Sequence, residues 1–114
     1  VLVNAVGGWH SQAPVTDFAE ADWDEIIDLN LKSAFLCIRA AAKVMVAQKS
    51  GRIINMASQA GLGPNPATHS NIAYACSKAG VIALSKHLAR QLGPDGIADT
   101  VEVALATAQR LVSP

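Results

Sequence analysis

An excess of charge of either sign is missing from this sequence. Nine lysines and arginines balance nine acidic residues in a chain of 114 residues, so the formal net charge is zero. Such a chain lacks the basic surface with which proteins attract nucleic acid or anionic membranes. Aromatic residues are also few, at 4%, whereas hydrophobic residues reach 51% and suffice for a core. We therefore expect one domain, or a piece of one, whose partner is a small molecule or a second copy of the chain.

Cysteines and long apolar runs are scarce as well. Cys37 and Cys76 stand far apart, without the spacing of a metal site or a disulfide framework, so we interpret both as small core residues in a reducing compartment. The longest apolar stretch, Ala34 to Ala47, contains Arg39 and Lys43, which excludes a membrane span there. No signal peptide opens the sequence, and a cytoplasmic location is expected.

The first half of the chain predicts a strand, a long helix and a second strand. Val1 to Ala5 is rich in β-branched residues and runs into a glycine turn, which indicates a buried strand. Asp22-Trp23-Asp24-Glu25 has the pattern of a capping box, so a helix is expected from there to about Gln48. Arg52 to Ser58 lacks clean alternation, as is typical of a parallel strand covered on both faces. This succession is a right-handed βαβ crossover and predicts an α/β fold.

The second half predicts a loop, a second helix and a tail. The loop from Gly61 to Asn71 leads to a helix over about Ile72 to Leu92, which Ser70 or Asn71 can cap and Gly93-Pro94 ends. From Thr100 to Leu111 we favour a helix, because alanine and leucine dominate. We therefore divide the chain into a central part, residues 1–97, and a divergent helical tail, residues 98–114.

The first long helix has an unusually apolar surface. From Leu31 to Ala47 its polar positions are mainly Lys32, Arg39 and Lys43, which cluster in a narrow sector at helical spacing. A helix of this kind is buried on more than one side. One side is expected to face the sheet, and the other to face a partner subunit or an uncovered sheet in a larger chain.

Three polar residues stand where chemistry is expected. Tyr74 and Lys78 are four apart near a helix start and share a face, although a solvent-facing lysine beside a half-buried tyrosine would look the same. Ser58 lies at the carboxyl end of the second strand, where open parallel sheets bind ligands, although many such serines only form turns. Asn30 interrupts an apolar helix stripe, and its amide needs partners, either local backbone or a water near a site.

These residues and their flanks resemble a known family. In order, the segments are Leu2 to Gly8, Leu29-Asn30-Leu31, Gly51 to Ser58 and Tyr74 to Gly80, and they are similar to the motifs of the short-chain dehydrogenase/reductases, in particular the ketoacyl-reductase-like members. The resemblance covers about residues 1–97 and implies part of a Rossmann-type doubly wound parallel sheet. It also implies transfer of a hydride between NAD or NADP and a carbonyl or secondary alcohol, as in a 3-oxoacyl reductase.

The resemblance assigns a role to each residue. Tyr74 would exchange a proton with the substrate oxygen, Ser58 would hold that oxygen, and Asn30 would support a water-linked proton relay. Lys78 would bond the nicotinamide ribose, and an ammonium beside a phenol also favours the phenolate. Tyr74 and Lys78 therefore count as cofactor-binding residues too, together with a turn in which the family usually has Asn-Asn-Ala-Gly: Asn4, Ala5, Val6 and Gly7.

Departures from the family pattern leave alternatives open. The glycine-rich pyrophosphate turn is not in the chain, and the family's next strand, which ends in Pro-Gly, is not recognisable after Ile97. Because the sequence also starts at Val1 inside an apolar run, we expect a fragment of a longer enzyme. The alternatives are a truncated, non-catalytic interaction module, or an epimerase or dehydratase. Self-association is expected through the two long helices.

No metal site is expected from the sequence. His10, His69 and His87 have no ligand-like spacing, and no aspartate or glutamate stands beside them in the sequence to complete a set.

Overall fold

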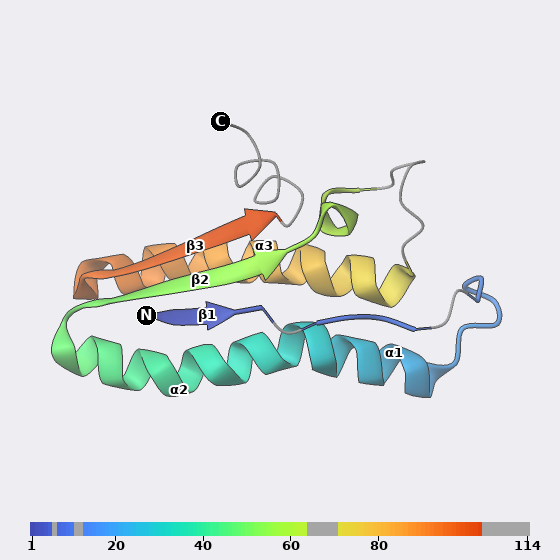
Figure 1. The fold of residues 1–114 in the computed structure, drawn as a ribbon, viewed down its shortest axis with the longest axis horizontal. Coiled ribbons are helices and arrows are strands. Elements are labelled where there is room, and N and C mark those ends of the chain that lie inside the picture. Colours follow the sequence, from blue (N-terminus) through green and yellow to red (C-terminus); the bar gives the residue numbers. More distant parts are fainter. Residues whose placement is uncertain (6, 11–12, 64–70, 104–114) are drawn as a thin grey trace.

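Three parallel strands form the centre of the molecule, for which a computed structural model describes residues 1–5, 7–10, 13–63 and 71–103. The strands are β1, Leu2–Asn4, β2, Gly51–Ala57, and β3, Ile97–Val103. They lie in the order β1-β2-β3 in one sheet (Figure 1). Leu2 is paired with Ile53, and Gly51 with Ile97. The expected α/β class with a parallel sheet is confirmed.

A long, interrupted helix connects β1 to β2. It consists of α1, Glu20–Ile27, a π-helical turn η1, Asp28–Lys32, and α2, Ser33–Gln48. The helix begins at Glu20, two residues before the expected capping box, and no side chain caps it. Glu20 and Asp22 lie in the first turn, where their negative charge complements the helix dipole. The helix ends at Lys49, which has a left-handed φ of 56°.

A second helix, α3, Ile72–Leu92, connects β2 to β3 and has the bounds that the sequence predicts. It begins after Asn71, whose side chain accepts a hydrogen bond from the Tyr74 amide. Its end is followed by a 3-10 turn, η3, Gly93–Asp95, in which a proline stops the α-helical hydrogen bonding. Local capping signals at both ends explain the agreement.

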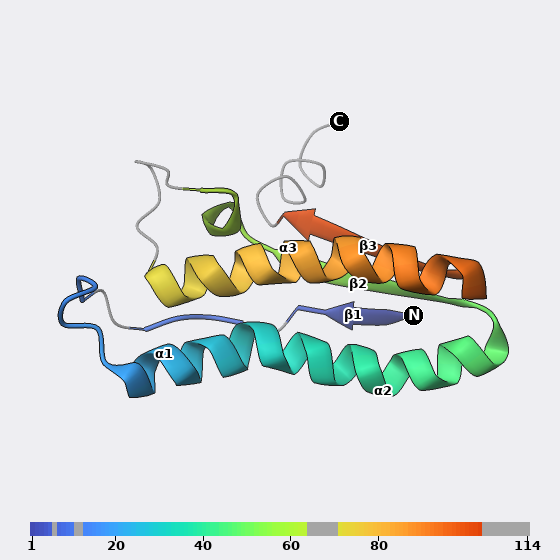
Figure 2. The ribbon, with the colours of Figure 1, turned by 180° about the vertical axis from the view of Figure 1, so that it is seen from behind.

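The helices α2 and α3 pack on the same face of the sheet and enclose the core (Figures 1 and 2). That core combines Ile38 and Met45 of α2, Ile53 of β2, Leu92 of α3 and Ile97 of β3. Two successive right-handed crossovers in one direction place both helices on one face. Along β2, Ile53, Asn55 and Ala57 are buried against them.

The opposite face of the sheet is only partly covered. Ile54 and Met56 of β2 are intermediate in exposure, and Val3 of β1 is 54% exposed. The expectation that β2 is covered on both faces is therefore not met within the described residues. The physical reason is the connectivity, since both crossovers between described strands run over the other face.

Two further expectations about local structure are wrong. Residues 100–103 belong to strand β3, not to a helix, because they pair with Ile54 to Ala57 of β2. The remainder of the expected helical tail, residues 104–114, lies outside the described residues. Cys37 and Cys76 are both exposed and free, not core residues.

The outer face of α2 is apolar, as its sequence suggested, but within the described residues it is exposed and not buried on a second side. Phe35, Leu36, Val44 and Val46 are each at least 37% exposed. Beside them, a groove runs between α2 and α3, lined by residues that include Ile38, Ala42, Leu84, Leu88 and Leu92. No helix in the described part of the chain is long and apolar enough to cross a membrane.

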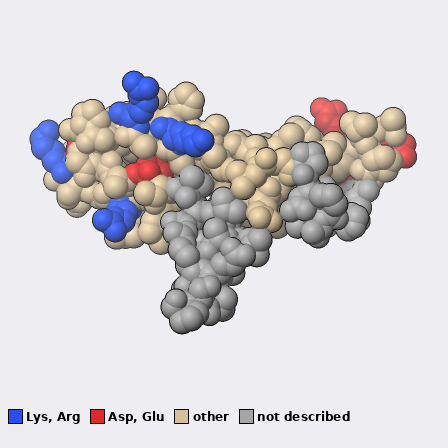
Figure 3. Space-filling view, turned by 90° about the horizontal axis from the view of Figure 1, so that it is seen from above, with Lys and Arg blue, Asp and Glu red and all other residues tan. Residues whose placement is uncertain are grey.

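Charges separate along the molecule although they sum to zero. On the face shown in Figure 3, lysine and arginine side chains gather towards one end, with some acidic atoms among them, and only acidic side chains stand out at the opposite end, where α1 lies. The sequence explains the acidic end, since residues 1–31 contain no lysine or arginine, whereas residues 17–28 hold six acidic residues.

Candidate active site

Tyr74 and Lys78 face each other on the first turns of α3. The Lys78 Nζ lies 5.7 Å from the centre of the Tyr74 ring. On another side, the Trp9 ring packs on the Tyr74 ring, with centres 6.3 Å apart and planes tilted by 46°. Asn71 fixes this turn because its Oδ1 accepts the Tyr74 N–H at 2.8 Å. The pair predicted from the sequence is therefore a contact in the structure, and the tyrosine is half-buried.

Lys78 is a buried cation rather than a surface lysine. The residue is 5% exposed, and its Nζ donates a hydrogen bond to the Met56 carbonyl at 3.3 Å. Burial disfavours the charged ammonium and lowers the pKa of Lys78. A Cβ at Gly7 would lie 3.0 Å from Nζ, so the ammonium sits between the turn after β1 and the end of β2.

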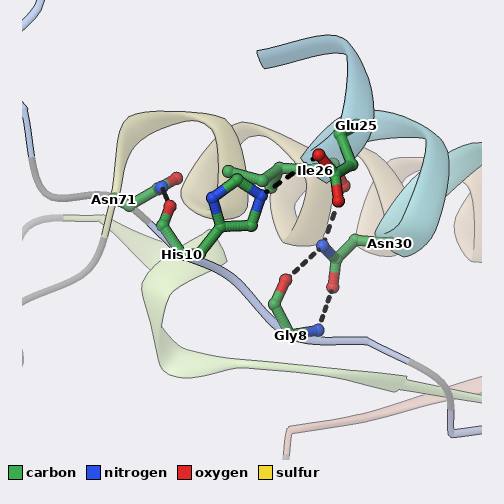
Figure 4. Close-up of polar contacts among 6 residues, drawn as sticks. All are labelled: Gly8, His10, Glu25, Ile26, Asn30 and Asn71. Carbon is green, nitrogen blue, oxygen red and sulfur yellow. Dashed lines mark hydrogen bonds and ion pairs between the residues drawn. The ribbon is translucent and has the colours of Figure 1, made fainter. Parts of the chain in front are cut away.

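Asn30 joins that same turn to the long helix. Its Nδ2 donates to the Gly8 carbonyl at 2.7 Å and to the Ile26 carbonyl at 2.8 Å, and its Oδ1 accepts the Gly8 N–H at 2.9 Å (Figure 4). Asn30 is 1% exposed and lies in the π-helical turn η1. A Cβ at Gly7 would come within 2.5 Å of Oδ1, which leaves room only for glycine. Of the two alternatives that the sequence left open, the structure shows backbone partners, one local, Ile26, and one distant, Gly8.

Ser58 follows β2 and begins the 3-10 turn η2, Gln59–Leu62. Its Oγ accepts the Ala60 N–H at 3.2 Å, which is a capping contact. Gly61 of η2 lies against α3 so closely that a Cβ there would be 2.6 Å from the Ala79 nitrogen and the Lys78 carbonyl carbon. Ser58 is thus anchored beside the helix turn that carries Lys78. Within the described residues, no hydrogen bond joins the Ser58 and Tyr74 hydroxyls.

The other positions that the sequence predicts to bind cofactor have different surroundings. The Asn4 amide donates to Asn55 Oδ1 at 2.8 Å, so it binds within the sheet. Ala5 is exposed after the end of β1. Gly7 lies beside Lys78 and Asn30, as described above, and Val6 lies outside the described residues. The structure therefore brings Asn30, Lys78, Tyr74 and Gly7 together at one end of the sheet.

A buried polar network behind the site was missed by sequence reasoning. The Asn55 Nδ2 donates to Ser85 Oγ at 2.7 Å and to Asp99 Oδ1 at 3.0 Å. Asp99 is 8% exposed, and its Oδ2 has no partner among the described residues. Burial raises the pKa of Asp99 to about 6, although hydrogen bonds from Ser85 and Asn55 oppose the rise. Polar residues inside the apolar segment of β2 were the available signal.

The histidines also behave differently from the sequence expectation. His10 lies beside two acidic residues of α1, Asp22 and Glu25, although neither is near it in the sequence. His87 is exposed on α3, and His69 lies outside the described residues.

Comparison with known proteins identifies the family. The family model described as short chain dehydrogenase matches residues 1–108. The 3-oxoacyl-[acyl-carrier-protein] reductase FabG of Staphylococcus aureus strain Mu50 is 46% identical over 97 residues, which cover 85% of this chain and 38% of that protein. The chain therefore spans well under half the length of this relative.

Solved structures give the same result. A 3-oxoacyl-[acyl-carrier protein] reductase from Brucella melitensis with bound NAD superposes with a TM-score of 0.82 at 33% identity, over 87% of this chain and 38% of that one. The structure described as ElxO with NADP bound superposes with a TM-score of 0.80 at 31% identity, over 88% of this chain and 39% of that one. The expected Rossmann-type fold is confirmed, and the chain belongs to the short-chain dehydrogenase family.

Proposed function

We propose that this chain provides the catalytic part of an NAD(P)-dependent oxidoreductase that reduces a carbonyl group, of 3-oxoacyl type, or oxidises the corresponding secondary alcohol. The observation that carries the proposal is the buried Lys78 ammonium held 5.7 Å from the Tyr74 ring. Burying a lysine costs free energy, which is why buried lysines concentrate at functional sites. A structural lysine on this helix would instead extend into solvent.

The residues at the site suit a nicotinamide cofactor. An ammonium has three hydrogens to donate, and among the described residues Lys78 gives only one hydrogen bond, to the Met56 carbonyl. The other hydrogens are available for the ribose hydroxyls of the cofactor, which supplies the hydride when bound. NAD and NADP both remain in the proposal, since the similar structures carry one or the other.

Tyr74 and Ser58 would manage the oxygen of the substrate. The Ser58 Oγ accepts a hydrogen bond from the Ala60 amide, so its own O–H is free to donate to a carbonyl oxygen. The Tyr74 hydroxyl would give its proton to the same oxygen as the hydride arrives at carbon. In the oxidative direction, the neighbouring Lys78 cation favours the phenolate that takes the proton back.

The proposed role of Asn30 in a proton relay takes a specific form. Both hydrogens of its amide are used by the Gly8 and Ile26 carbonyls, and its oxygen accepts the Gly8 amide. The side chain therefore fixes the turn beside Lys78, and any relay water would be bound by the backbone of η1. π-Helical turns of this kind occur frequently at functional sites.

The test uses the protein that carries this chain. Tyr74→Phe is expected to abolish NADPH- or NADH-dependent reduction of a 3-oxoacyl thioester while reducing cofactor binding far less, because proton transfer requires the phenol hydroxyl whereas Lys78 still holds the ribose. Trp23→Phe on α1 serves as the control for a conservative aromatic change. Undiminished turnover in Tyr74→Phe would refute the assignment. Formation of an epimer or a dehydrated product, without net oxidation of cofactor, would instead support the epimerase or dehydratase alternative.

We further propose that the chain self-associates through α2 and α3 and that its location is cytoplasmic. The support is the exposed apolar row on α2, which includes Phe35 and Val46, beside the groove against Leu84 and Leu88 of α3. Exposed apolar patches of this kind are commonly interfaces. Phe35→Glu is expected to shift the sedimentation of the chain towards the monomer, whereas Leu62→Glu, an exposed residue of η2, is not. A sedimentation profile unchanged by Phe35→Glu would contradict this interface.

Titration of the 114-residue chain with NADH and NADPH distinguishes the non-catalytic interaction module from the oxidoreductase. Saturable binding would exclude the module as the sole function, and self-association without binding would favour it.

A further inference from the structure

His10, Asp22 and Glu25 form a cluster at the acidic end of the molecule, outside the catalytic residues. Each offers one potential ligand atom, and these three atoms all lie within 4.8 Å of one another. Asp22 and Glu25 are three apart on α1, so they share one face of the helix. His10 reaches this face from the segment after β1, and Figure 4 shows its ring directed towards Glu25.

The separation of two of the three ligand atoms is that of neighbouring ligands on one metal ion. The His10 Nε2 and the Glu25 Oε2 are 3.4 Å apart. Two ligands that each lie about 2.0–2.1 Å from Zn²⁺ in tetrahedral geometry are separated by about 3.3–3.4 Å. One imidazole with two carboxylates is a donor set suited to Zn²⁺ and its neighbours among the transition metals, whereas Mg²⁺ and Ca²⁺ prefer oxygen alone.

The charge around the cluster also favours a cation. Glu20, Asp24 and Asp28 lie on or next to the same helix, and no lysine or arginine occurs before Lys32. The two carboxylates of the cluster would balance the charge of a divalent ion. Figure 3 shows the acidic side chains of this end of the molecule well separated from the lysine and arginine side chains.

The cluster is partly organised in advance. The His10 carbonyl accepts a hydrogen bond from the buried Asn71 Nδ2 at 2.7 Å, which holds the backbone of His10 beside the start of α3 (Figure 4). The direct contact between His10 and Glu25, by contrast, is a weak organiser. Their side chains are 49% and 70% exposed, and exposed ion pairs contribute little to stability. Little stability is therefore lost when a metal ion replaces this contact.

We propose that His10, Asp22 and Glu25 coordinate one divalent transition-metal ion, with water completing its coordination. The expected ion is Zn²⁺. The ion joins the segment after β1 to α1. Through the His10 carbonyl and Asn71, the same segment is connected to the helix turn that carries Tyr74. The ion is structural, and the proposal does not depend on the reductase activity.

The test is a calorimetric titration of the untagged, metal-free 114-residue chain with ZnCl₂, with Co²⁺ absorption as a second readout. We expect saturable binding of one ion per chain. His10→Ala and Glu25→Gln should each weaken the affinity at least about tenfold, since each removes a ligand. His87→Ala, which removes an exposed histidine elsewhere on the surface, should leave it unchanged.

A variant that keeps a metal-binding side chain at the same position distinguishes the loss of a ligand from a disturbed fold. Glu25→His keeps a donor at the same position and adds an imidazole, so Zn²⁺ and Co²⁺ should bind at least as tightly as in the unchanged chain. Far-UV circular dichroism monitors the helices in every variant. Equal Zn²⁺ affinity in His10→Ala and the unchanged chain would overturn the proposal, as would the absence of saturable binding to a chain with intact helical signal. Neither result bears on the Tyr74→Phe test, which is measured by hydride transfer.

Discussion

Asp99 offers the sharpest test of how the buried polar network affects stability. The carboxyl lies 92% buried on β3, with Oδ1 bonded to Asn55 and Oδ2 without a partner among the described residues. Its pKa is raised to about 6 from an ordinary value of 3.8, mainly because burial disfavours the carboxylate. We predict that Asp99→Asn removes a pH-dependent loss of stability that the unchanged chain suffers.

The sign and size follow from proton linkage. An acid with a higher pKa in the folded state binds its proton more tightly there, so stability is greatest below pH 3.8 and declines until the pH passes about 6. A shift of this size corresponds to about 3 kcal/mol at neutral pH and above. Asp99→Asn resembles the protonated acid in shape. The variant should therefore match the unchanged chain at about pH 4 and exceed its stability by up to about 3 kcal/mol at about pH 8.

Urea unfolding, followed by far-UV circular dichroism, measures this difference at both pH values. The buried amide of Asp99→Asn changes the free energy of unfolding by the same amount at both pH values. This constant contribution therefore cancels when the two pH values are compared. Asp17→Asn, which neutralises an exposed aspartate in the loop before α1, is the matched control and should show no comparable pH dependence. A stability difference between Asp99→Asn and the unchanged chain that varies by less than about 0.5 kcal/mol from pH 4 to pH 8 would refute the reasoning.

Two further predictions concern the end of the sheet where the candidate catalytic residues meet. Gly7→Ala places a methyl group 2.5 Å from the Asn30 Oδ1, so it should lower the free energy of unfolding by about 1–3 kcal/mol. Gly8→Ala, whose methyl group would have no atom within 4 Å, should change this free energy far less. Urea unfolding of the two variants measures the difference, and equal effects would contradict the close packing at Gly7. In the protein that carries this chain, Lys78→Met removes an ammonium whose pKa burial lowers, so it should raise the thermal midpoint while weakening cofactor binding; a clear loss of stability would show that the hydrogen bond to Met56 outweighs the cost of burying the charge.

The elements with strong local signals could be predicted from the sequence. Helix α3 has its predicted bounds because Asn71 caps its start and the Gly93-Pro94 pair ends it. Strand β3 could not be predicted. Its residues acquire an extended conformation by pairing with β2, and this long-range interaction places residues 100–103 in a strand where the sequence favoured a helix.

The candidate catalytic residues could likewise be predicted only in part. The spacing of Tyr74 and Lys78 predicts a shared helix face, and the structure places them in contact. The sequence does not show that Lys78 is buried, because that depends on the turn after β1 and the end of β2 meeting around its ammonium. Asn30 was recognised as an amide in an apolar stripe, but its partner Gly8 lies 22 residues away.

The sequence by itself determined the family, the α/β class and the residue types available for chemistry, since motifs and hydrophobic periodicity are local properties of the chain. Only the tertiary structure decided which polar groups meet. Asn55 and Asp99 bond across neighbouring strands, and His10 reaches Asp22 and Glu25 because the chain reverses between β1 and α1. Burial and electrostatic environment arise from such long-range contacts, so the raised pKa of Asp99 and the lowered pKa of Lys78 are properties of the fold.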